Sequence, residues 1–300
     1  SNKSGFSLIH QKKSNADIGI VFQGAFPTHN YYFANNMNLI KRRNIYIQNN
    51  LSFFIKNKYF KNYHKNHSYL FSKLQVIPPV GQQITYCLSI FNRLLQKILK
   101  KLFFKKSYWS VGLYFSNWKN FLFNEAHIIP NPKNCYLADP FIFSYADKDY
   151  CFLEEYSFEN SKGTIVAYEI SSKKISRIGC IINESFHMSF PFIFEFEGGV
   201  FMLPETSENN DIRIYEATEF PIKWKLKKIL MKNVFAVDSM IFFHRDLWWL
   251  FSNINPDNGT DACSDLNIFF ATHPFSETWE EHPLNPLIVD SELARNAGMI

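Results

Sequence analysis

The stretch "ADPFIF" at residues 138–143 decides the fold, because similar stretches are repeated later in the chain. The further copies follow at regular intervals: "SFPFIF" (189–194), "VDSMIF" (237–242) and a shorter "NAGMI" (296–300). They align on one position, 51, 48 and 59 residues apart, which is occupied in turn by Asp139, Phe190, Asp238 and Ala297. One short strand-like unit is therefore repeated along the C-terminal two thirds of the chain.

Each full copy is followed by the same succession of strand-like segments. The second segments are "YCFLEEY" (150–156), "VFMLPET" (200–206) and "WWLFSNI" (248–254). The third are "TIVAYEIS" (164–171), "DIRIYEAT" (211–218) and "DLNIFFAT" (265–272), and the looser fourth are "ISRIGCII", "KWKLKKIL" and "TWEEHPLNPLIV". Their β-branched and aromatic residues, separated by turns, indicate antiparallel hairpins. Four short strands repeated at about 40 to 50 residues are typical of propeller blades. The alternative is a β-sandwich whose strands resemble one another.

The segment before the first repeat fits the same plan. "YWSVGLYFS" (108–116) resembles a third strand and "WKNFLFNEAHIIP" (118–130) a fourth. We therefore predict a mainly β fold over residues 107–300, a β-propeller. The inner half of this first blade is expected after the last full unit, where the sequence runs only one strand further. The ring is thus expected to be incomplete, and a further segment or a partner chain would complete it.

Charge divides the chain near Ser107. Residues 1–106 hold 17 Lys and Arg and a single acid, Asp17, which leaves 15 basic and 26 acidic residues of the totals 32 and 27 for residues 107–300. Such asymmetry indicates two parts with different partners. We predict a basic N-terminal α/β or helical region over 1–106 and the propeller domain over 107–300.

The N-terminal region carries two readable segments. "ADIGIVFQGAF" (16–26) predicts a buried strand followed by a turn. In "IFNRLLQKILKKLFFKKS" (90–107) the apolar residues fall on one helical stripe and the cations on the remaining face. This predicts an amphipathic helix near 90–106, which either packs on the rest of the protein or lies peripherally on an anionic membrane. No P-loop, GxGxxG or RNA-binding pattern occurs, so no nucleic acid partner is expected.

Five scattered cysteines without a CxxC pair predict neither disulfides nor a metal site. No stretch is long and apolar enough to span a membrane, and no signal peptide is visible. These features predict a cytoplasmic protein, peripheral on the inner face of the plasma membrane if the amphipathic helix binds lipid.

In a propeller the first strands of the blades line the axis, so residues at their starts converge. Asp139 and Asp238 are expected there, and register places Glu155, Glu205 and Asn253 at the returning ends of the second strands. Gathered carboxyls suit glycosidic-bond chemistry, which needs a proton donor and a proton acceptor. The residues predicted to bind substrate are Glu155, His187, Asn253, Arg295 and Trp248, and those predicted to be catalytic are Asp139, Glu205 and Asp238.

Several of these residues also have a purely structural interpretation. An Asp before Pro, as at 139, commonly forms a turn, and Asp238 is equally able to act as a cap. Glu154 and Glu155 are adjacent on a strand, so only one of them can face the axis. Most Trp and Phe residues are expected to form the cores of the blades.

The order of motifs resembles a known family. "ADPF", "EEY", "HMSFPF", "PET", "AVDS" and "WWLF" occur in the order found in the propeller domain at the N-terminus of plant glucosamine inositolphosphorylceramide transferases and in bacterial relatives encoded with surface-polysaccharide genes. That domain is similar to the five-bladed propellers of furanosidases and mannoside phosphorylases, so the resemblance implies a five-bladed propeller of the glycosidase kind. The resemblance implies that Asp139 is a base, Glu205 an acid and Asp238 a residue that tunes the acid. It departs at Phe190, where the furanosidases carry their tuning Asp, and it does not cover residues 1–106.

The function predicted from this resemblance is glycosyl transfer in bacterial surface-polysaccharide synthesis, with a nucleotide-sugar donor and a glycan or lipid-linked sugar as substrate. The alternatives are a glycoside hydrolase of the furanosidase-like propeller type, a non-catalytic glycan-binding module, and a scaffold closed by another subunit.

Overall fold

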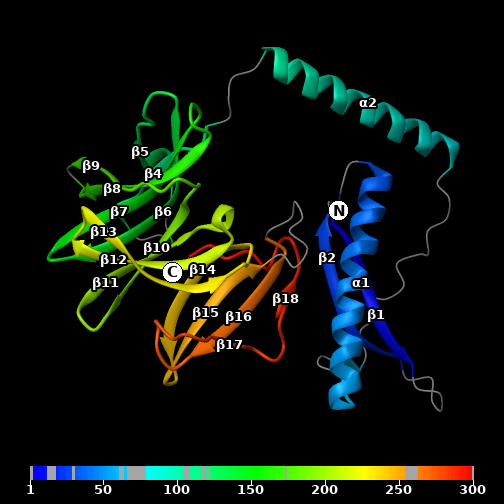
Figure 1. Cartoon of the computed structure of the whole chain (residues 1–300). Helices are drawn as coiled ribbons and strands as arrows, with labels where there is room; N and C mark the ends of the chain where they lie inside the picture. The colour runs from blue at the N-terminus through cyan, green and yellow to red at the C-terminus, as the bar shows by residue number, and fades with distance from the viewer. Residues whose placement is uncertain are drawn as a thin grey trace. The chain divides into compact units, whose positions relative to one another are not determined.

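The computed structural model describes residues 3–11, 18–28, 31–60, 64–65, 79–103, 108–116, 119, 122–172, 174–254 and 263–298 (Figure 1). The chain divides into two compact units. The first comprises Ser1–Ser107 with Ile288–Leu293, and the second comprises Tyr108–Leu287 with Ala294–Ile300. The division falls next to the predicted boundary at Ser107, and residues 288–293 group with the first unit.

The first unit is an α/β arrangement. Strands β1 (Lys3–Gln11) and β2 (Ile18–Pro27) are antiparallel, and β3 (His64–Lys65) pairs with the other edge of β2. Helix α1 (Tyr32–Asn57) contributes Tyr46, whose ring stacks on Phe22 at 4.8 Å. The predicted strand over 16–26 is confirmed from Ile18 onward, and residues 16 and 17 lie outside the described residues.

Residues 288–293 join this unit through apolar burial. Strand β18 (Ile288–Val289) places Val289 in a buried cluster with Phe22, Phe26 and Tyr46. The N–H of Ser291 donates to the carbonyl of Ala25 (3.0 Å), which fixes the segment along β2. Val289 therefore contributes to the apolar core of the first unit.

Helix α2 (Val80–Phe103) is the predicted amphipathic helix, and it begins ten residues earlier than the predicted start at Ile90. Residues 104–106 lie outside the described residues. Among the helices in the described ranges, none combines the length and the apolar character needed to cross a bilayer.

The second unit consists of the repeats. The first forms β6 (Cys135–Tyr145), β7 (Lys148–Ser157), β8 (Lys162–Ile170) and β9 (Ile175–Ile182). The second forms β10 (Ser189–Phe196), β11 (Gly199–Glu205), β12 (Asp211–Glu219) and β13 (Lys223–Lys232). The third forms β14 (Ala236–His244), β15 (Leu247–Ile254), β16 (Asp265–Ala271) and β17 (Glu280–Glu281). Within each repeat consecutive strands are antiparallel neighbours, which confirms the four-strand unit.

The segment before the first repeat forms β4 (Val111–Leu113) and β5 (His127–Ile129), an antiparallel pair as predicted. Residues 117, 118, 120 and 121 lie outside the described residues, as do 299 and 300 of the fourth copy, and residues 296–298 form no strand. The described part of the second unit thus amounts to three full repeats and one two-stranded sheet. A closed ring of five blades is not established by it.

The same tight turn joins the first and second strands of every repeat. Its two central residues both have positive φ: Ala146 (49°) and Asp147 (59°), Glu197 (48°) and Gly198 (76°), Arg245 (49°) and Asp246 (62°). Two-residue loops with positive φ at both positions match the right-handed twist of paired strands. Each hairpin therefore starts from the same geometry, and the register of its two strands can be counted from the turn.

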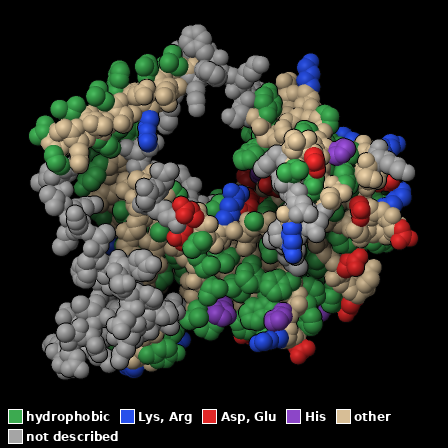
Figure 2. Space-filling view, turned by 180° about the vertical axis from the view of Figure 1, so that it is seen from behind, with side chains coloured by type: hydrophobic (Ala, Val, Ile, Leu, Met, Phe, Trp, Pro, Cys, Tyr) green, Lys and Arg blue, Asp and Glu red, His purple; other side chains and the backbone are tan. Residues whose placement is uncertain are grey.

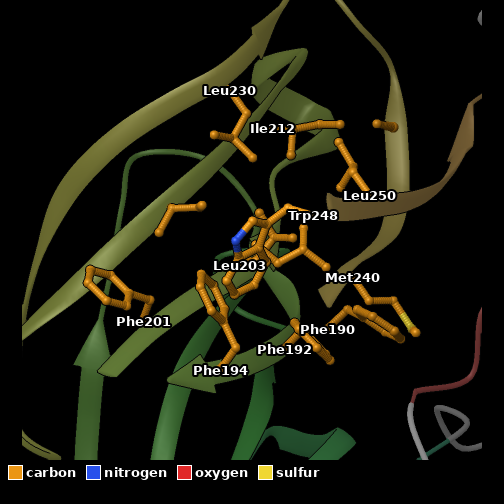
Figure 3. Close-up of a cluster of buried hydrophobic side chains, with 13 residues drawn as sticks. Phe190, Phe192, Phe194, Phe201, Leu203, Ile212, Leu230, Met240, Trp248 and Leu250 are labelled. Carbon is orange, nitrogen blue, oxygen red and sulfur yellow. The ribbon is translucent and has the colours of Figure 1, made fainter. Parts of the chain in front are cut away.

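Apolar clusters join consecutive repeats. Between the second and third repeats lies a cluster that includes Phe194, Leu203, Ile212 and Leu250, with Trp248 packed 5.9 Å from the Phe194 ring (Figure 3). A second cluster, centred on Phe152, Met188, Met202 and Tyr215, joins the first and second repeats. Full burial of such side chains contributes about 1.5 to 3 kcal/mol each, so these clusters hold the sheets of consecutive repeats together.

Candidate active site

A bulge recurs at the start of each inner strand. The pairing register shifts between Ala138 and Phe141 in β6, between Ser189 and Phe192 in β10, and between Val237 and Met240 in β14. The residue entering each bulge has positive φ: Asp139 (47°), Phe190 (46°) and Asp238 (51°). These are the positions aligned from the sequence, so the repeat is confirmed at the level of backbone conformation. Bulges redirect the side chains beside them, and they are frequent next to active sites.

The residues opposite the bulges correct the predicted register. Ala138 pairs with Glu154, Ser189 with Glu205 and Val237 with Asn253. Glu154, and not Glu155, is thus the counterpart of Glu205.

Glu155 points to the other face of β7, because successive side chains of a strand alternate. Its carboxylate accepts a hydrogen bond from Arg177 Nη2 at 2.9 Å. The predicted alignment of Glu155 with Glu205 is therefore wrong, and a role of Glu155 in substrate binding stays a prediction.

Side chains at the bulges link each repeat to the next. Asp139 Oδ2 accepts a hydrogen bond from the N–H of Phe190 (3.3 Å), and Glu205 Oε2 accepts one from the N–H of Asp238 (3.3 Å). Asp238 in turn accepts a hydrogen bond from Arg295 Nε at its Oδ2 (2.8 Å). Four carboxyl groups from three repeats therefore gather at the starts of the inner strands. We call them the carboxyl cluster: Asp139, Glu154, Glu205 and Asp238.

The carboxyl cluster has unusual protonation. Burial raises the pKa of Glu154 to about 8, and the negative charges of Asp139 and Glu205 add to the effect. Burial also raises the pKa of Glu205 to about 7, against a lowering by the hydrogen bond from Ser207 Oγ (2.7 Å). The pKa of Asp238 is raised by burial and lowered by Arg295, with a net upward shift. At neutral pH the cluster therefore holds both proton donors and proton acceptors, which is the condition for general acid–base chemistry.

His187 lies beside Glu154. Its Nδ1 accepts the N–H of Gly163 (2.9 Å), so the neutral imidazole carries its proton on Nε2, 3.6 Å from Glu154 Oε1. Burial lowers the pKa of His187, which favours this neutral form. Glu154 Oε1 is buried and accepts no hydrogen bond from any residue that the structure describes.

Gly163 is required by the crowding at this point. A Cβ there would lie 2.5 Å from the carbonyl oxygen of Met188 and 2.7 Å from Glu154 Oε1. Any larger residue would push the Glu154 carboxyl or the loop that carries His187 out of place.

The loop before β10 is held by the second repeat. The N–H of His187 donates to Glu208 Oε2, and the guanidinium of Arg213 lies 4.8 Å from the ring centre of Phe186. The short 3-10 turn Ser207–Asn209 brings both Ser207 and Glu208 to the end of β11. His187 is therefore placed beside the cluster by groups of a different repeat.

Asn253 lies among backbone groups next to Arg295. Its side chain is fully buried, with Nδ2 donating to the carbonyl of Ala294 (2.9 Å) and Oδ1 accepting the N–H of Asn296 (3.0 Å). Both ends of the amide thus fix the backbone around Arg295, and the role of Asn253 in substrate binding stays a prediction. The side chain of Arg295 remains 60% exposed beside Asp238, so its predicted role in binding an anionic group stays a prediction.

Trp248 is also misplaced by the prediction. It is the second residue of β15, opposite Phe243 at the end of the hairpin remote from Asp238, and is buried between Phe194 and Phe196. It packs the core and does not line the cluster (Figure 3).

The aromatic residues that do adjoin the cluster went unnoticed in the sequence. The rings of Tyr136 and Tyr156 stack at 4.9 Å, and Tyr156 lies 5.9 Å from the His187 ring. Burial raises the pKa of Tyr136 to about 12, with further contributions from Glu154 and nearby charges. Both tyrosines are half-buried. Their spacing, two residues from Ala138 and from Glu154 respectively, would have revealed them once the register was known.

In the described ranges no three His, Cys, Asp or Glu side chains are arranged to hold a metal ion.

Comparisons with known proteins relate this unit to one protein family. Residues 124–300 match the family described as glucosamine inositolphosphorylceramide transferase 1, N-terminal. The glucosamine inositolphosphorylceramide transferase 1 of Arabidopsis thaliana is 34% identical over 171 residues, which cover 56% of this chain and 22% of that protein. The protein of the same name from Oryza sativa subsp. japonica is 32% identical over 173 residues, which cover 56% of this chain and 23% of that protein. The chain thus spans about a fifth of the length of these relatives. The family match confirms the resemblance seen in the order of motifs.

Among solved structures, a family 117 glycoside hydrolase from Zobellia galactanivorans is similar with a TM-score of 0.42 and 13% identity, covering 61% of this chain and 64% of that one. An endo-arabinase from Bacteroides thetaiotaomicron is similar with a TM-score of 0.40 and 14% identity, and the match covers 48% of this chain and 60% of that one.

Proposed function

The chain belongs to the glucosamine inositolphosphorylceramide transferase 1, N-terminal, family, and on this basis we propose that its carboxyl cluster acts on a sugar substrate in glycosyl transfer. The observation that carries the proposal is the gathering of carboxyl groups from three repeats at one end of the inner strands. Because the chain spans about a fifth of its curated relatives, their whole activity is carried to this protein as part of the proposal.

The roles follow from protonation and exposure. Glu205, with a pKa of about 7 and a hydrogen bond from Ser207, is the proton donor to the leaving oxygen. Asp139, which is only half-buried, accepts the proton of the attacking hydroxyl. Asp238 tunes Glu205, since its charge raises the pKa of Glu205 and its N–H donates to the Glu205 carboxylate. In transfer, the acceptor hydroxyl attacks the anomeric carbon while the bond to the leaving oxygen breaks.

Neighbouring groups supply binding. The stacked rings of Tyr136 and Tyr156 offer an apolar face to a sugar, and the Nε2–H of His187 is a hydrogen-bond donor. The exposed guanidinium of Arg295 suits a phosphate or carboxylate on the substrate. We propose a nucleotide sugar as donor and a glycan or lipid-linked sugar as acceptor.

The setting is also proposed. The relatives named above are plant transferases of an inositolphosphorylceramide, which favours a glycolipid acceptor. We place this activity in bacterial surface-polysaccharide synthesis, in the cytoplasm at the inner face of the plasma membrane. The same proposal has a further segment or a partner chain complete the unit to a five-bladed ring.

The test uses two glutamates of matched chemistry. Glu205→Gln removes the proton donor, whereas Glu155→Gln removes a carboxylate that pairs with Arg177 outside the cluster. The full chain is incubated with a panel of nucleotide sugars and with inositolphosphorylceramide in vesicles, and products are measured by mass spectrometry. Glu205→Gln should lower the rate by about 10²- to 10⁴-fold, the usual contribution of a general acid, and Glu155→Gln should not. Turnover by Glu205→Gln at the wild-type rate would refute the assignment, and released free sugar would indicate hydrolysis instead of transfer.

A non-catalytic glycan-binding module is the second candidate. It is favoured by Phe190, which stands in the second repeat where the first and third carry Asp139 and Asp238, so the series of bulge acids is interrupted. This candidate predicts glycan binding without turnover by the wild type, and binding that survives Glu205→Gln.

A further inference from the structure

Helix α2 exposes a continuous apolar stripe. At 3.6 residues per turn, Val80, Ile84, Phe91, Leu95 and Ile98 fall on one face. The exposed fractions of Val80, Phe91 and Ile98 are 69%, 65% and 56%. Figure 2 shows hydrophobic side chains along the length of this helix. A helix on the surface of a globular protein normally buries such a stripe against the core.

The charge of α2 is one-sided. The helix contains no Asp or Glu, and its cations are Arg93, Lys97, Lys100 and Lys101. By their spacing these four positions fall off the stripe. The surrounding residues 1–106 carry 17 cations and one acid. A partner for this helix must therefore combine an apolar layer with negative charge beside it.

The contact between α2 and α1 leaves the stripe uncovered. The N–H of Tyr32, at the start of α1, donates to Tyr86 Oη (3.2 Å). Each residue of an α-helix turns the chain by about 100°, so Tyr86 lies about 200° around the helix from Ile84. Tyr86 is therefore on the side of α2 opposite the apolar stripe. The helix is held to its own unit by a face other than the apolar one.

We propose that α2 lies flat in the interface of a bilayer that contains anionic lipids. At 1.5 Å per residue its 24 residues extend over roughly 36 Å. The apolar stripe would enter the boundary between headgroups and acyl chains, and the cations would contact lipid phosphates, as in other interfacial helices. A spanning arrangement is not proposed, since α2 is not apolar enough to cross a membrane. The proposal rests on the first unit alone and stands or falls independently of the glycosyl transfer proposed for the second.

The test is flotation of the full chain with vesicles of phosphatidylcholine alone or mixed with phosphatidylserine. We expect binding to the anionic vesicles, weakened by salt because surface charges are screened. Two charge-matched double variants locate the contact: Phe91→Asp with Ile98→Asp on the stripe, and Ser89→Asp with Gln96→Asp on the other face. Each added acid near an anionic surface weakens binding roughly fivefold in both variants. The stripe variant should lose at least about a hundredfold more, because two large apolar side chains no longer enter the lipid.

Hydrogen exchange of the wild type guards against a variant that misfolds. Residues 80–103 should gain protection when anionic vesicles are added and should not with phosphatidylcholine alone. Absence of vesicle binding, equal loss in the two double variants, or unchanged exchange of α2 would each overturn the proposal. So would light scattering that shows a second copy of the chain covering the stripe, with self-association abolished by the stripe variant and no affinity for vesicles.

Discussion

Replacement of Glu154 by Gln should remove a dependence of stability on pH. The pKa of Glu154 rises from 4.5 to about 8 in the folded protein, mainly because the group is buried. The folded state therefore keeps a proton on Glu154 that the unfolded chain loses above about pH 4.5. A raised carboxyl pKa destabilises the folded state as pH rises through this interval, and the penalty is complete above about pH 8. The difference of about 3.5 pKa units corresponds to about 5 kcal/mol at roughly 1.4 kcal/mol per unit.

The assay is urea unfolding followed by tryptophan fluorescence at about pH 5, 7 and 9. All six tryptophans lie between residues 109 and 279, so the signal reports on the second unit. At about pH 5 the wild type and Glu154→Gln should differ little, because the wild-type carboxyl is neutral in the folded state. At about pH 9 the variant should be more stable by about 3 to 5 kcal/mol.

Two neighbours serve as controls. Glu155→Gln removes a half-buried carboxylate one residue away that pairs with Arg177, so it reports what the loss of a glutamate from β7 does outside the carboxyl cluster. His187 acts in the opposite direction, since its lowered pKa makes the folded state lose stability as pH falls below about 6.5. This contribution is common to all three proteins and cancels in the comparison. If the curves of the wild type and Glu154→Gln run parallel from about pH 5 to 9, Glu154 is not a buried protonated acid and the electrostatic account of the carboxyl cluster fails.

Three further substitutions test the surroundings of the cluster. Gly163→Ala should destabilise the second unit by about 1 to 3 kcal/mol in urea unfolding, because its Cβ would meet Glu154 Oε1 and the Met188 carbonyl, whereas Gly81→Ala, with nothing nearby, should not. Asn253→Ala should cost about 1 to 3 kcal/mol by leaving the Ala294 carbonyl and the Asn296 N–H unpaired, and should speed hydrogen exchange at Asn296. Trp248→Ala should cost about 3 to 5 kcal/mol by opening a cavity in the core, and an unchanged midpoint would contradict its placement there.

The strands of the second unit were predictable because their signal is local. Each repeat alternates apolar segments with turns, and order along the chain was enough to identify the four-strand units. The position of the acid on β7 was not predictable in the same way. Side chains alternate with period two, so the slip of one residue that aligned Glu155 with Glu205 exchanged the two faces of the strand.

A count from the turn would have prevented this error. Glu154, Glu205 and Asn253 are each the seventh residue of a second strand, which begins at Lys148, Gly199 or Leu247 directly after a two-residue turn. The turns differ in sequence: Ala146-Asp147, Glu197-Gly198 and Arg245-Asp246. Only the second contains the glycine by which such a turn is usually recognised in a sequence. Their common positive φ emerges from the hairpins that they close.

Long-range packing could not be predicted from the local pattern. Val289 packs against Phe22, Phe26 and Tyr46, more than two hundred residues away. The start of α2 was missed because Gly81, Thr85 and Ser89 weaken the helical signal before Ile90, although Val80, Ile84 and Leu88 continue the stripe.

The backbone conformation of the recurrent bulge does not require an acidic residue. A bulky residue with positive φ is uncommon, yet Phe190 adopts the same conformation as Asp139 and Asp238. Its side chain packs against Phe141 with ring centres 4.8 Å apart, while its N–H still donates to Asp139. The backbone of the bulge therefore performs one task in the second and third repeats, which is to offer an N–H to a carboxylate of the repeat before. Because that link does not depend on the side chain, the second repeat accommodates an apolar residue at the bulge, and Phe190 adds its ring to the buried cluster that joins the second and third repeats.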